Sequence, residues 1–582
     1  MRRRSPSPVL AVALLAAVAL LSVPATTRAN WPQGSGPPYN TPIIAIPTEQ
    51  MNPRVVTDSR CGAIVIWRDF RDQVTGGTGL YMQRADSLGM LQWDPSAVPV
   101  CTVGSNNISD CSMVSDGAGG AITAWTDGRS FMGGHIYAQR VNSDGVPRWT
   151  TDGIPLCLSL REQMAPIAVQ DGAGGAIVVW NTVVDVVYTE DLYAQRVDST
   201  GATLWATNGV PVCTATDNQT FHAACADGAG GVIVVWSDYR SGNHTALYAQ
   251  RLNSSGARMW AANGVPVCDA SGVRGWSTIV SDGSGGAIVA WLERTLAGDQ
   301  LVYAQHMNSA GVRQWAASGV PLTTAGPQVE AVTVSDGAGG AIVAWKDLRA
   351  GYAYGGDIYA RRISSAGVPL WTADGVPLCM APNDQEAAAI LSDGHGGAIV
   401  TWDDYRPGYD VDIYAQRVDS AGTPRWTPDG AEVSIAPGYQ FVPALASDGA
   451  GGAIIAWEDR RTGLDYDIYA QKLNAFGGLG SPVAVPEGGG RASVSFACGP
   501  NPARAASTLR WNLPREARVK LTVHDATGRL VTTLVDGVQP AGDHSARWNL
   551  RDSAGRAVPS GLYFVRLEAD GRRLTRRLVA LR

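Results

Sequence analysis

One phrase, containing a glycine-rich turn and a tryptophan, recurs eight times along the chain and constrains its fold more than any other feature. One copy reads Ser281-Asp-Gly-Ser-Gly-Gly-Ala-Ile-Val-Ala-Trp291. The successive tryptophans are Trp67, Trp125, Trp180, Trp236, Trp291, Trp345, Trp402 and Trp457. The gaps between them are 58, 55, 56, 55, 54, 57 and 55 residues. A period this regular indicates a repeat architecture, in which each repeat is one supersecondary unit.

Each repeat carries strand patterns and no helical periodicity. In the third repeat, residues 163–170 form a mixed run, and Asp171-Gly-Ala-Gly-Gly175 supplies the glycines of a hairpin turn. Residues 176–180 are continuously apolar and largely β-branched, which is typical of a strand buried on both faces. Residues 192–197 alternate, and a fourth strand is expected to start at residues 202–205. Four short strands predict one antiparallel sheet per repeat.

The chain is therefore expected to be all-β, with residues 41–486 forming an eight-bladed β-propeller. Seven repeats carry a second tryptophan, whereas the eighth reads Ala475-Phe-Gly-Gly-Leu-Gly480 at that place. The apolar run Ile43-Ile-Ala-Ile46 precedes the first repeat, and we expect it to complete the last blade and so cover an exposed strand edge. An open β-solenoid is the alternative.

The start of the chain has the layout of a secretory signal peptide. Three arginines follow Met1, residues 9–23 are apolar, and Thr27-Arg28-Ala29 offers small residues at a cleavage site. We therefore predict a signal peptide over residues 1–29, a linker over residues 30–40, and no transmembrane helix in the mature chain. An uncleaved anchor is the alternative. The protein is expected to be secreted or held at the outer cell surface.

The charge distribution argues against nucleic acid as a partner. Residues 498–582 contain 15 Lys and Arg against 7 Asp and Glu, a net +8, which leaves −14 for the remainder given −6 overall. An acidic body does not attract a polyanion. Scattered surface arginine is the simplest interpretation of the basic tail.

Most repeats place an acidic residue two positions after the tryptophan and an arginine two positions later. The pairs are Asp69/Arg71, Asp127/Arg129, Asp238/Arg240, Asp347/Arg349, Asp404/Arg406 and Asp459/Arg461. Repeat 5 has Glu293/Arg294 and repeat 3 has Asn181-Thr182. A ring of such pairs could bind sugar or a cation, but a contact present in nearly every repeat is more typical of a scaffold. We interpret them as structural pairs that hold the following loop.

The Asp-Gly-x-Gly-Gly turns lack the ligand spacing of known calcium loops, so we interpret them as turns. No clustered histidines, nucleophile elbow or phosphate loop occurs, so no catalytic residue, metal site or cofactor is predicted. Nine cysteines are present, five of them at equivalent repeat positions. Two pairs, Cys101/Cys111 and Cys213/Cys225, are candidate disulfides because export permits them, and buried free thiols are the alternative.

The C-terminal region differs from the repeats. Residues 487–497 begin with Glu487-Gly-Gly-Gly490 and are expected to be a flexible linker. Residues 498–582 contain short alternating runs separated by Asp525-Ala-Thr-Gly528 and Asp552-Ser-Ala-Gly555, which predict a small β-sandwich.

Four motifs of the C-terminal region resemble those of two related groups of domains. The motifs are Pro500-Asn-Pro502, Val523-His-Asp-Ala-Thr-Gly-Arg529, Gly542-Asp-His-Ser-Ala-Arg-Trp548 and Pro559-Ser-Gly-Leu-Tyr-Phe-Val-Arg-Leu567. One of these groups is the Ig-like domain of flagellar hook-assembly proteins, and the other is the C-terminal sorting domain of cargo exported by the bacterial type IX secretion system. The repeats resemble those of bacterial secreted β-propellers. The sorting-domain resemblance implies a partner in the secretion machinery and attachment to the cell surface, whereas a plain Ig-like spacer is the alternative.

Together these features predict a secreted or cell-surface protein that binds an extracellular glycan or protein without catalysis. The alternative is an extracellular polysaccharide hydrolase or lyase, which needs unusual carboxylates gathered in one pocket. Candidate departures from the repeat are Asp185 and Glu190 in one loop and Gly351-Tyr-Ala-Tyr-Gly-Gly356 in another.

Overall fold

A computed structural model describes most of the chain. The described residues are 31, 40–71, 77–102, 108–129, 133–184, 189–242, 245–268, 273–294, 298–324, 326–351, 355–408, 410–463, 465–480, 495–499, 503, 506–513, 516–526, 528–540, 542–569 and 572–581. The predicted signal peptide, residues 1–29, and most of the predicted linker, residues 487–497, lie outside them.

Each of the eight repeats forms a four-stranded antiparallel sheet, and the described residues contain no helix. The first strands of repeats 1 to 8 are β2 (Gln50–Thr57), β6 (Ile108–Ser115), β10 (Gln163–Gln170), β14 (Gln219–Ala226), β18 (Val273–Ser281), β22 (Gln328–Ser335), β26 (Gln385–Ser392) and β30 (Gln440–Ser447). The second strands are β3 (Ala63–Asp69), β7 (Ala121–Asp127), β11 (Ala176–Val183), β15 (Val232–Asp238), β19 (Ala287–Arg294), β23 (Ala341–Asp347), β27 (Ala398–Asp404) and β31 (Ala453–Asp459).

The outer half of each sheet is formed by the third and fourth strands. The third strands are β4 (Gly79–Ala85), β8 (His135–Val141), β12 (Glu190–Val197), β16 (Ala246–Leu252), β20 (Gln300–Met307), β24 (Asp357–Ile363), β28 (Asp412–Val418) and β32 (Asp467–Leu473). The fourth strands are β5 (Val98–Cys101), β9 (Ile154–Pro155), β13 (Val210–Cys213), β17 (Val265–Pro266), β21 (Val320–Pro321), β25 (Val376–Cys379), β29 (Ala431–Ser434) and, in repeat 8, β1 (Thr41–Ile44).

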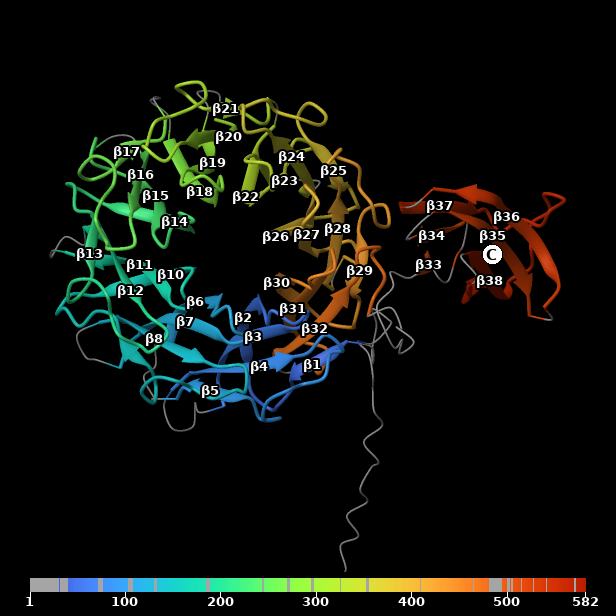
Figure 1. Cartoon of the computed structure of the whole chain (residues 1–582), viewed down its shortest axis with the longest axis horizontal. Coiled ribbons are helices and arrows are strands. Elements are labelled where there is room, and N and C mark those ends of the chain that lie inside the picture. Colours follow the sequence, from blue (N-terminus) through green and yellow to red (C-terminus); the bar gives the residue numbers. More distant parts are fainter. Residues whose placement is uncertain are drawn as a thin grey trace, which may run out of the picture.

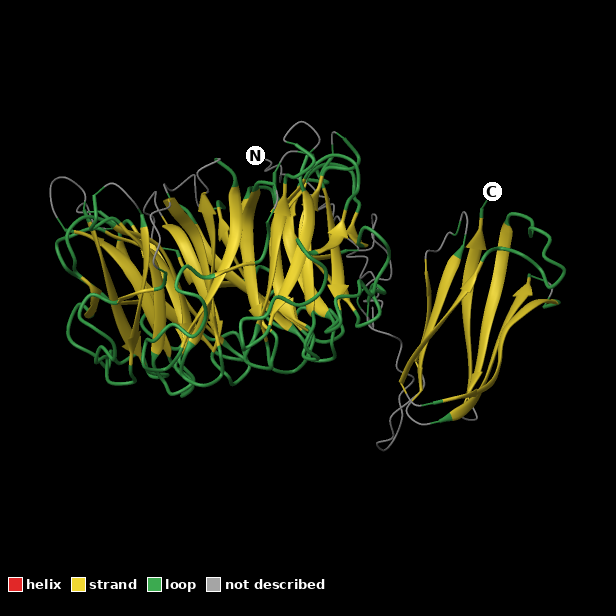
Figure 2. Ribbon diagram, turned by 90° about the horizontal axis from the view of Figure 1, so that it is seen from above, coloured by secondary structure: helices red, strands yellow, loops and turns green. Residues whose placement is uncertain are grey.

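The eight sheets follow one another around a ring, with their first strands nearest its centre (Figure 1). Each first strand contacts the first strand of the next repeat, and β30 of repeat 8 contacts β2 of repeat 1. Seen from the side, the strands run between two faces that carry the connecting loops (Figure 2). Each sheet is a separate four-stranded unit, so the ring is held by side chains packed between sheets.

The continuous apolar second strand follows from its position between two neighbours. Along β7, Ala121 and Trp125 pack with residues of repeat 1, whereas Ile122 and Ala124 pack with residues of repeat 3. Both faces of the strand are therefore buried, and alternation would expose a polar side chain to one of the two cores. The tryptophan is completely buried in all eight repeats.

The N-terminal segment joins repeat 8 to repeat 1. Strand β1 pairs with β32, as expected from the sequence, with Thr41 opposite Ala470. Asn40 is buried and donates to the carbonyl of Val433 at 3.1 Å. This segment belongs to the last sheet although almost the whole ring separates it from that sheet in sequence, and such pairing covers the open edge of β32.

Trp31 replaces the second tryptophan that repeat 8 lacks. In the other repeats a turn glycine packs on the second tryptophan of the preceding repeat, so that a Cβ atom at Gly145 would lie 2.7 Å from Trp93. In repeat 1 the corresponding Gly89 faces Trp31, at 2.8 Å. Trp31 is 1% exposed, and residues 32–39 lie outside the described part of the chain.

The expected start of the fourth strand was wrong. In repeat 3, residues 202–205 make an isolated bridge at Thr203, and β13 begins at Val210. Trp205 instead donates its backbone N–H to Oε1 of Gln195 at 3.0 Å. The alternating pattern of four residues is too short to distinguish a strand from a turn that a side chain stabilises.

The C-terminal region forms a β-sandwich, as predicted. One sheet contains β33 (Ser495–Gly499), β34 (Ser507–Leu513) and β37 (Gly542–Trp548). The other has the order β36 (Leu530–Gln539), β35 (Ala517–Asp525), β38 (Gly561–Ala569), β39 (Arg572–Ala580). One buried cluster that includes Trp511, Trp548 and Leu567 lies between the sheets.

Candidate functional site

In six repeats the second strand ends in an aspartate that is buried and paired with an arginine. In repeat 2, Asp127 accepts hydrogen bonds from Nε1 of Trp125 and from Nε of Arg129, each at 2.8 Å. Arg129 also donates to the carbonyl of Asp152 at 2.8 Å and lies 4.0 Å from the ring centre of Tyr137. The ion pair recurs in repeats 1, 4, 6, 7 and 8. The interpretation as a structural pair is confirmed, because no carboxylate oxygen faces solvent.

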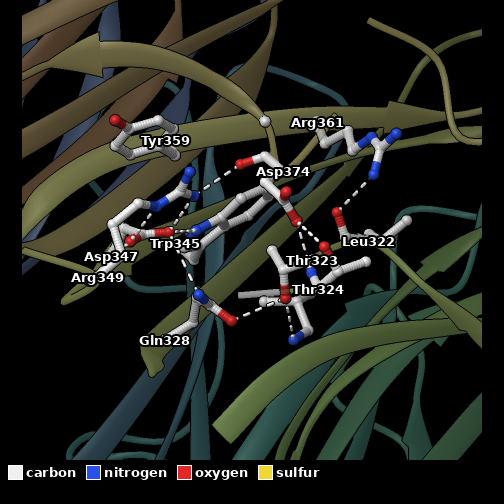
Figure 3. A network of polar contacts seen from close by, with 12 residues as sticks. Leu322, Thr323, Thr324, Gln328, Trp345, Asp347, Arg349, Tyr359, Arg361 and Asp374 are labelled. Carbon is white, nitrogen blue, oxygen red and sulfur yellow. Dashed lines mark hydrogen bonds and ion pairs between the residues drawn. The ribbon is translucent and has the colours of Figure 1, made fainter. Parts of the chain in front are cut away.

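Figure 3 shows this network in repeat 6, where Asp347 lies between Trp345 and Arg349. The two departing repeats keep one part of it. Nε1 of Trp180 donates to the hydroxyl of Thr182 at 3.1 Å, and Nε1 of Trp291 donates to Glu293 at 3.0 Å. A buried indole N–H needs an acceptor, so each repeat supplies an oxygen two residues later.

A second network joins neighbouring repeats through the glycine-rich turns. Oδ1 of Asp116 accepts hydrogen bonds from the backbone N–H groups of Ala118 and Gly120, both at 2.8 Å. Its Oδ2 atom accepts a hydrogen bond from Nη2 of Arg140, also at 2.8 Å. Arg140 in turn donates to the carbonyl of Ser199, in the next repeat, at 3.0 Å. The turn interpretation is thus confirmed. No group of three or more His, Cys, Asp or Glu arranged to hold a metal ion occurs in the described residues.

The first strand of each sheet has a bulge near its start, and the bulge residue has positive φ in seven repeats. These residues are Asn52 (57°), Asp110 (47°), Ala165 (53°), Phe221 (48°), Trp276 (52°), Glu330 (56°) and Val442 (55°). Such a conformation is rare for bulky or β-branched residues and costs about 1–2 kcal/mol. Because the first strands are nearest the centre, these residues surround one end of the central opening, which we call the mouth. The bulge recurs in the repeats and is part of the scaffold, so what distinguishes one repeat from another at the mouth is the side chain that the bulge carries.

Two bulge residues form an exposed aromatic pair, which we call the first platform. Phe221 is 62% exposed and Trp276 is 65% exposed. Their ring centroids are 6.3 Å apart and their planes differ by 25°. A Cβ atom at the preceding Gly275 would meet nothing within 4 Å, so the space beside Trp276 is open. Large aromatic side chains are normally covered, so two adjacent exposed rings indicate a binding surface.

Repeats 6 and 7 place charged groups at the mouth. Nζ of Lys346 lies 2.9 Å from Asp384 and 2.8 Å from Glu386. The hydroxyl of Tyr405 donates to Oε2 of Glu386 at 3.4 Å. The carboxyl side chains of Asp384 and Glu386 remain 32% and 37% exposed. We call these four residues the polar strip.

The carboxyl groups in and next to the polar strip have pKa values shifted in different directions. Burial and the hydrogen bond with Asp384 raise the pKa of Glu386. Burial also acts on Asp384, but hydrogen bonds with Glu386 and Lys346 keep its pKa below the ordinary value. Asp403 lies behind the strip, and burial raises its pKa well above the ordinary value, with Glu386 adding to the effect. Its Oδ1 atom is buried without a hydrogen-bond partner.

Repeat 8 carries a second aromatic pair at the start of its first strand. The rings of Tyr439 and Phe441 are 5.6 Å apart and nearly parallel, at 9°. Tyr439 is 39% exposed. Phe441 also lies 6.5 Å from Tyr405, so this second platform is continuous with the polar strip.

Two loops were named from the sequence because they depart from the repeat, and among the described residues only one of them contacts the polar strip. Asp185 and residues 352–354 lie outside the described residues. Glu190 is half-buried, and burial together with Glu162 raises its pKa. Gly356 donates its backbone N–H to Asp384 at 2.6 Å, so the second departure does support the polar strip.

The platforms were missed because the repeat was read from its glycine-rich turn onward. A signal was available, since the bulge residue always precedes the repeat tryptophan by 15 positions, as Phe221 precedes Trp236 and Trp276 precedes Trp291. Aligning the repeats on that column reveals two consecutive aromatic residues at a position that otherwise varies.

The candidate pairs Cys101/Cys111 and Cys213/Cys225 are not bonded in this structure, where all four are free thiols. Cys213 packs in the core between repeats 3 and 4, whereas Cys225 packs against the core between repeats 4 and 5. Cys101 and Cys213 instead accept hydrogen bonds from Arg129 and Arg240. Burial raises the pKa of Cys213 to about 11. Cys101, Cys111 and Cys213 are buried and Cys225 is partly buried, as is common for free thiols packed as small apolar side chains.

Comparison with known proteins identifies the C-terminal domain. Residues 502–572 match the family model of the FlgD Ig-like domain. The C-terminal domain is Ig-like. A search of the curated proteins finds no match to the chain. The described residues contain no helix long and apolar enough to cross a membrane.

Several solved structures resemble the chain distantly. Two structures of puromycin hydrolase are 14% identical with TM-scores of 0.40 and 0.41, and the chain covers 58% and 61% of their length. They align with 70% and 73% of this chain. A polysaccharide lyase described as an ulvan lyase is 10% identical over 63% of this chain and 92% of its own, with a TM-score of 0.39. A Hadza microbial sialidase is 14% identical over 62% and 78%, with a TM-score of 0.33. Scores this low assign no activity to this chain.

Proposed function

We propose that this protein is a secreted or cell-surface binding protein without catalytic activity, and that its eight sheets form an eight-bladed β-propeller whose mouth binds an extracellular glycan. The observation that carries the proposal is the first platform. Phe221 and Trp276 are exposed, adjacent, and both lie at bulges where the backbone has positive φ. Aromatic faces offer apolar contact area at low conformational cost, which suits the C–H faces of sugar rings.

A glycan suits the mouth better than a protein ligand. The second platform, at Tyr439 and Phe441, adjoins hydroxyl and carboxyl groups of Tyr405 and Glu386, which can exchange hydrogen bonds with sugar hydroxyls. A protein interface of standard size needs a broader apolar centre.

The ends of the chain support an extracellular location. The N-terminal sequence has the layout of a signal peptide, and the sequence motifs of the C-terminal domain resemble those of sorting domains recognised by the type IX secretion machinery. We propose that this domain serves in secretion or surface attachment. Deleting residues 498–582 should then release the ring from the cell surface, or block its export, without changing glycan affinity. Unchanged surface display of the truncated chain would contradict this role.

A polysaccharide hydrolase or lyase is the second candidate. The raised pKa values of Glu386 and Asp403 favour it, because a carboxyl that keeps its proton can act as a general acid toward a leaving oxygen. However, Asp403 is only 5% exposed, so substrate does not reach it in this structure.

The proposal is tested with the full mature chain on a glycan array, followed by incubation with each bound polysaccharide. The wild type should bind, and the double variant Phe221→Ala/Trp276→Ala should lose binding. Met259→Ala is the matched control, since Met259 is 50% exposed but lies on a turn between third and fourth strands. New reducing ends or unsaturated products would support the enzyme instead. Equal binding by wild type and double variant would overturn the platform as the site.

A further inference from the structure

The two aromatic platforms lie on the same face of the ring. Phe221 and Phe441 both belong to the start of a first strand, where Gln219 pairs with Asp238 and Gln440 pairs with Asp459. The repeats have the same strand order, so their equivalent ends lie on one face. The platforms are thus two parts of one surface.

The residues between the platforms form a continuous path along the inner rim. From repeat 4 to repeat 8, the first strands β14, β18, β22, β26 and β30 are consecutive neighbours (Figure 1). Their starts carry the first platform, then Glu330, then Glu386, then Phe441. Side-chain contacts link the path from repeat 6 to repeat 8. Lys346 of repeat 6 forms an ion pair with Glu386 of repeat 7, and the ring of Tyr405 of repeat 7 contacts that of Phe441 of repeat 8.

The opposite rim differs. In repeats 1 to 3 neither the bulge residue nor the residue before it is aromatic: the pairs are Met51-Asn52, Ser109-Asp110 and Met164-Ala165. One half of the mouth therefore offers two apolar platforms joined by hydrogen-bonding groups, and the other half does not. A single sugar unit needs only one platform, so two platforms joined by a polar strip suit a chain of sugars.

The polar strip also restricts the charge of the ligand. Asp384 and Glu386 share one lysine, and Glu330 adds a further carboxyl at the neighbouring bulge. A polyanion such as a polyuronate would meet like charge along this path. Neutral hydroxyls, in contrast, can donate to the carboxylate oxygens and accept from Tyr405.

We infer that the ligand is an extended neutral polysaccharide that lies along the inner rim from the Phe221–Trp276 platform to the Tyr439–Phe441 platform and hydrogen-bonds to the polar strip between them. This inference rests on the proposed function, because it specifies the ligand of the same mouth. The first platform binds one end of the segment, and the second platform adds affinity only when the chain is long enough to reach it.

The test measures affinity against chain length by calorimetry with the full mature protein. The probes are oligosaccharides from disaccharide to octasaccharide prepared from β-glucan, xylan and galactomannan, with alginate and polygalacturonate as anionic comparators. For the wild type, affinity for one neutral series should rise with length and then level off. Tyr439→Ala should weaken the binding of the longest chains about 5-fold and leave that of the shortest unchanged, because stacking contributes about 1 kcal/mol. Trp276→Ala should weaken every length.

Two variants control the experiment. Tyr439→Phe should retain the binding of long chains, and Met259→Ala should match the wild type throughout. Far-ultraviolet circular dichroism at each step checks that the variants remain folded.

The possible failures are distinguishable. Binding that is independent of length, or Tyr439→Ala without effect on long chains, overturns the extended path but leaves glycan binding at the first platform. Alginate binding as tightly as the neutral chains overturns the neutral ligand. Absence of binding to every array glycan overturns the proposed function itself.

Discussion

The buried acidic networks and the bulges at the mouth both occur in nearly every repeat. The residue type is mostly constant in the networks, whereas it changes from repeat to repeat at the bulges. Asp127 and its counterparts are aspartate in six of the eight repeats, because hydrogen bonds from the repeat tryptophan and from one arginine surround each of these carboxylates. The bulge residues keep one backbone conformation but change from Asn52 to Trp276 around the ring. Side chains with fixed partners vary little, whereas side chains that face solvent can change freely. Function in a ring of repeats is thus expected where conformation recurs and identity does not.

The largest loss of stability is expected from breaking a buried acidic network. Asp127→Ala should lower the free energy of unfolding by about 3–5 kcal/mol, because it leaves Arg129 and the indole N–H of Trp125 without their acceptor. Urea unfolding followed by fluorescence measures the change. Asp110→Ala, at a bulge in the same repeat, should change stability by no more than about 0.5 kcal/mol. A similar loss in both variants would contradict the comparison.

The pH dependence of Asp127 has a defined sign. Burial acts to raise the pKa of this carboxyl, but hydrogen bonds from Arg129 and Trp125 hold it below the ordinary value. A pKa lower in the folded than in the unfolded state stabilises the fold above about pH 4, and this contribution is lost as the pH falls. The difference between wild type and Asp127→Ala should therefore shrink in acid.

Removing the tryptophan that closes the ring should cost about 3 kcal/mol, as for other buried tryptophans. Trp31→Ala opens a cavity against Gly89 between repeats 8 and 1. Trp205→Ala, at the equivalent place inside the ring, is the matched comparison. Calorimetric unfolding measures both changes in stability. Equal losses of stability would establish that Trp31 stabilises the ring as a repeat tryptophan does, whereas a negligible loss for Trp31→Ala alone would refute this role.

Asp412→Asn should stabilise the protein by about 2 kcal/mol near pH 8. Burial raises the pKa of Asp412 to about 7, and its cross-strand partner Asp404 adds to the shift. A pKa higher in the folded state means that stability is lost as pH rises through that value. The gain from Asn should thus vanish near pH 4. Thermal unfolding across this range measures it, and a gain that does not depend on pH would exclude the mechanism.

His306→Arg should restore the inter-repeat network of repeat 5 and add about 1 kcal/mol, the net value of one hydrogen bond. His306 contacts Asp282 at 2.8 Å, where six other repeats use an arginine that also donates to a carbonyl of the next repeat. Urea unfolding provides the measurement. His306→Gln, which lacks the charge, should not reproduce the gain.

The smallest effect on stability is expected at the mouth. Trp276→Gly relieves a positive φ of 52° but gives the unfolded chain more freedom, and these opposed contributions of about 1 kcal/mol nearly cancel. The melting temperature should hardly change, whereas binding to the array glycans should be lost. A large destabilisation would show that Trp276 belongs to the fold rather than to a site.

Much of the architecture was predictable because it depends on local patterns. The period of the tryptophans, the glycine-rich turns and the apolar runs led to four strands per repeat and to the pairing of β1 with the last sheet. The fourth strand was misplaced at Thr203, because a short run between turns carries little information. The buried role of Trp31 was missed for another reason, since its partner Gly89 lies in a different repeat.

The sequence by itself determined the repeat, the sheet of each repeat, the Asp–Arg pair after the repeat tryptophan and the glycine-rich turn, because each depends on residues close together in the chain. Only the tertiary structure decided where the ring closes and which residues meet at the mouth. Phe221 and Trp276 become neighbours, and Lys346 reaches Glu386, only when separate sheets pack side by side. Contacts between repeats depend on how the sheets pack against one another, and that arrangement leaves no local pattern in the sequence.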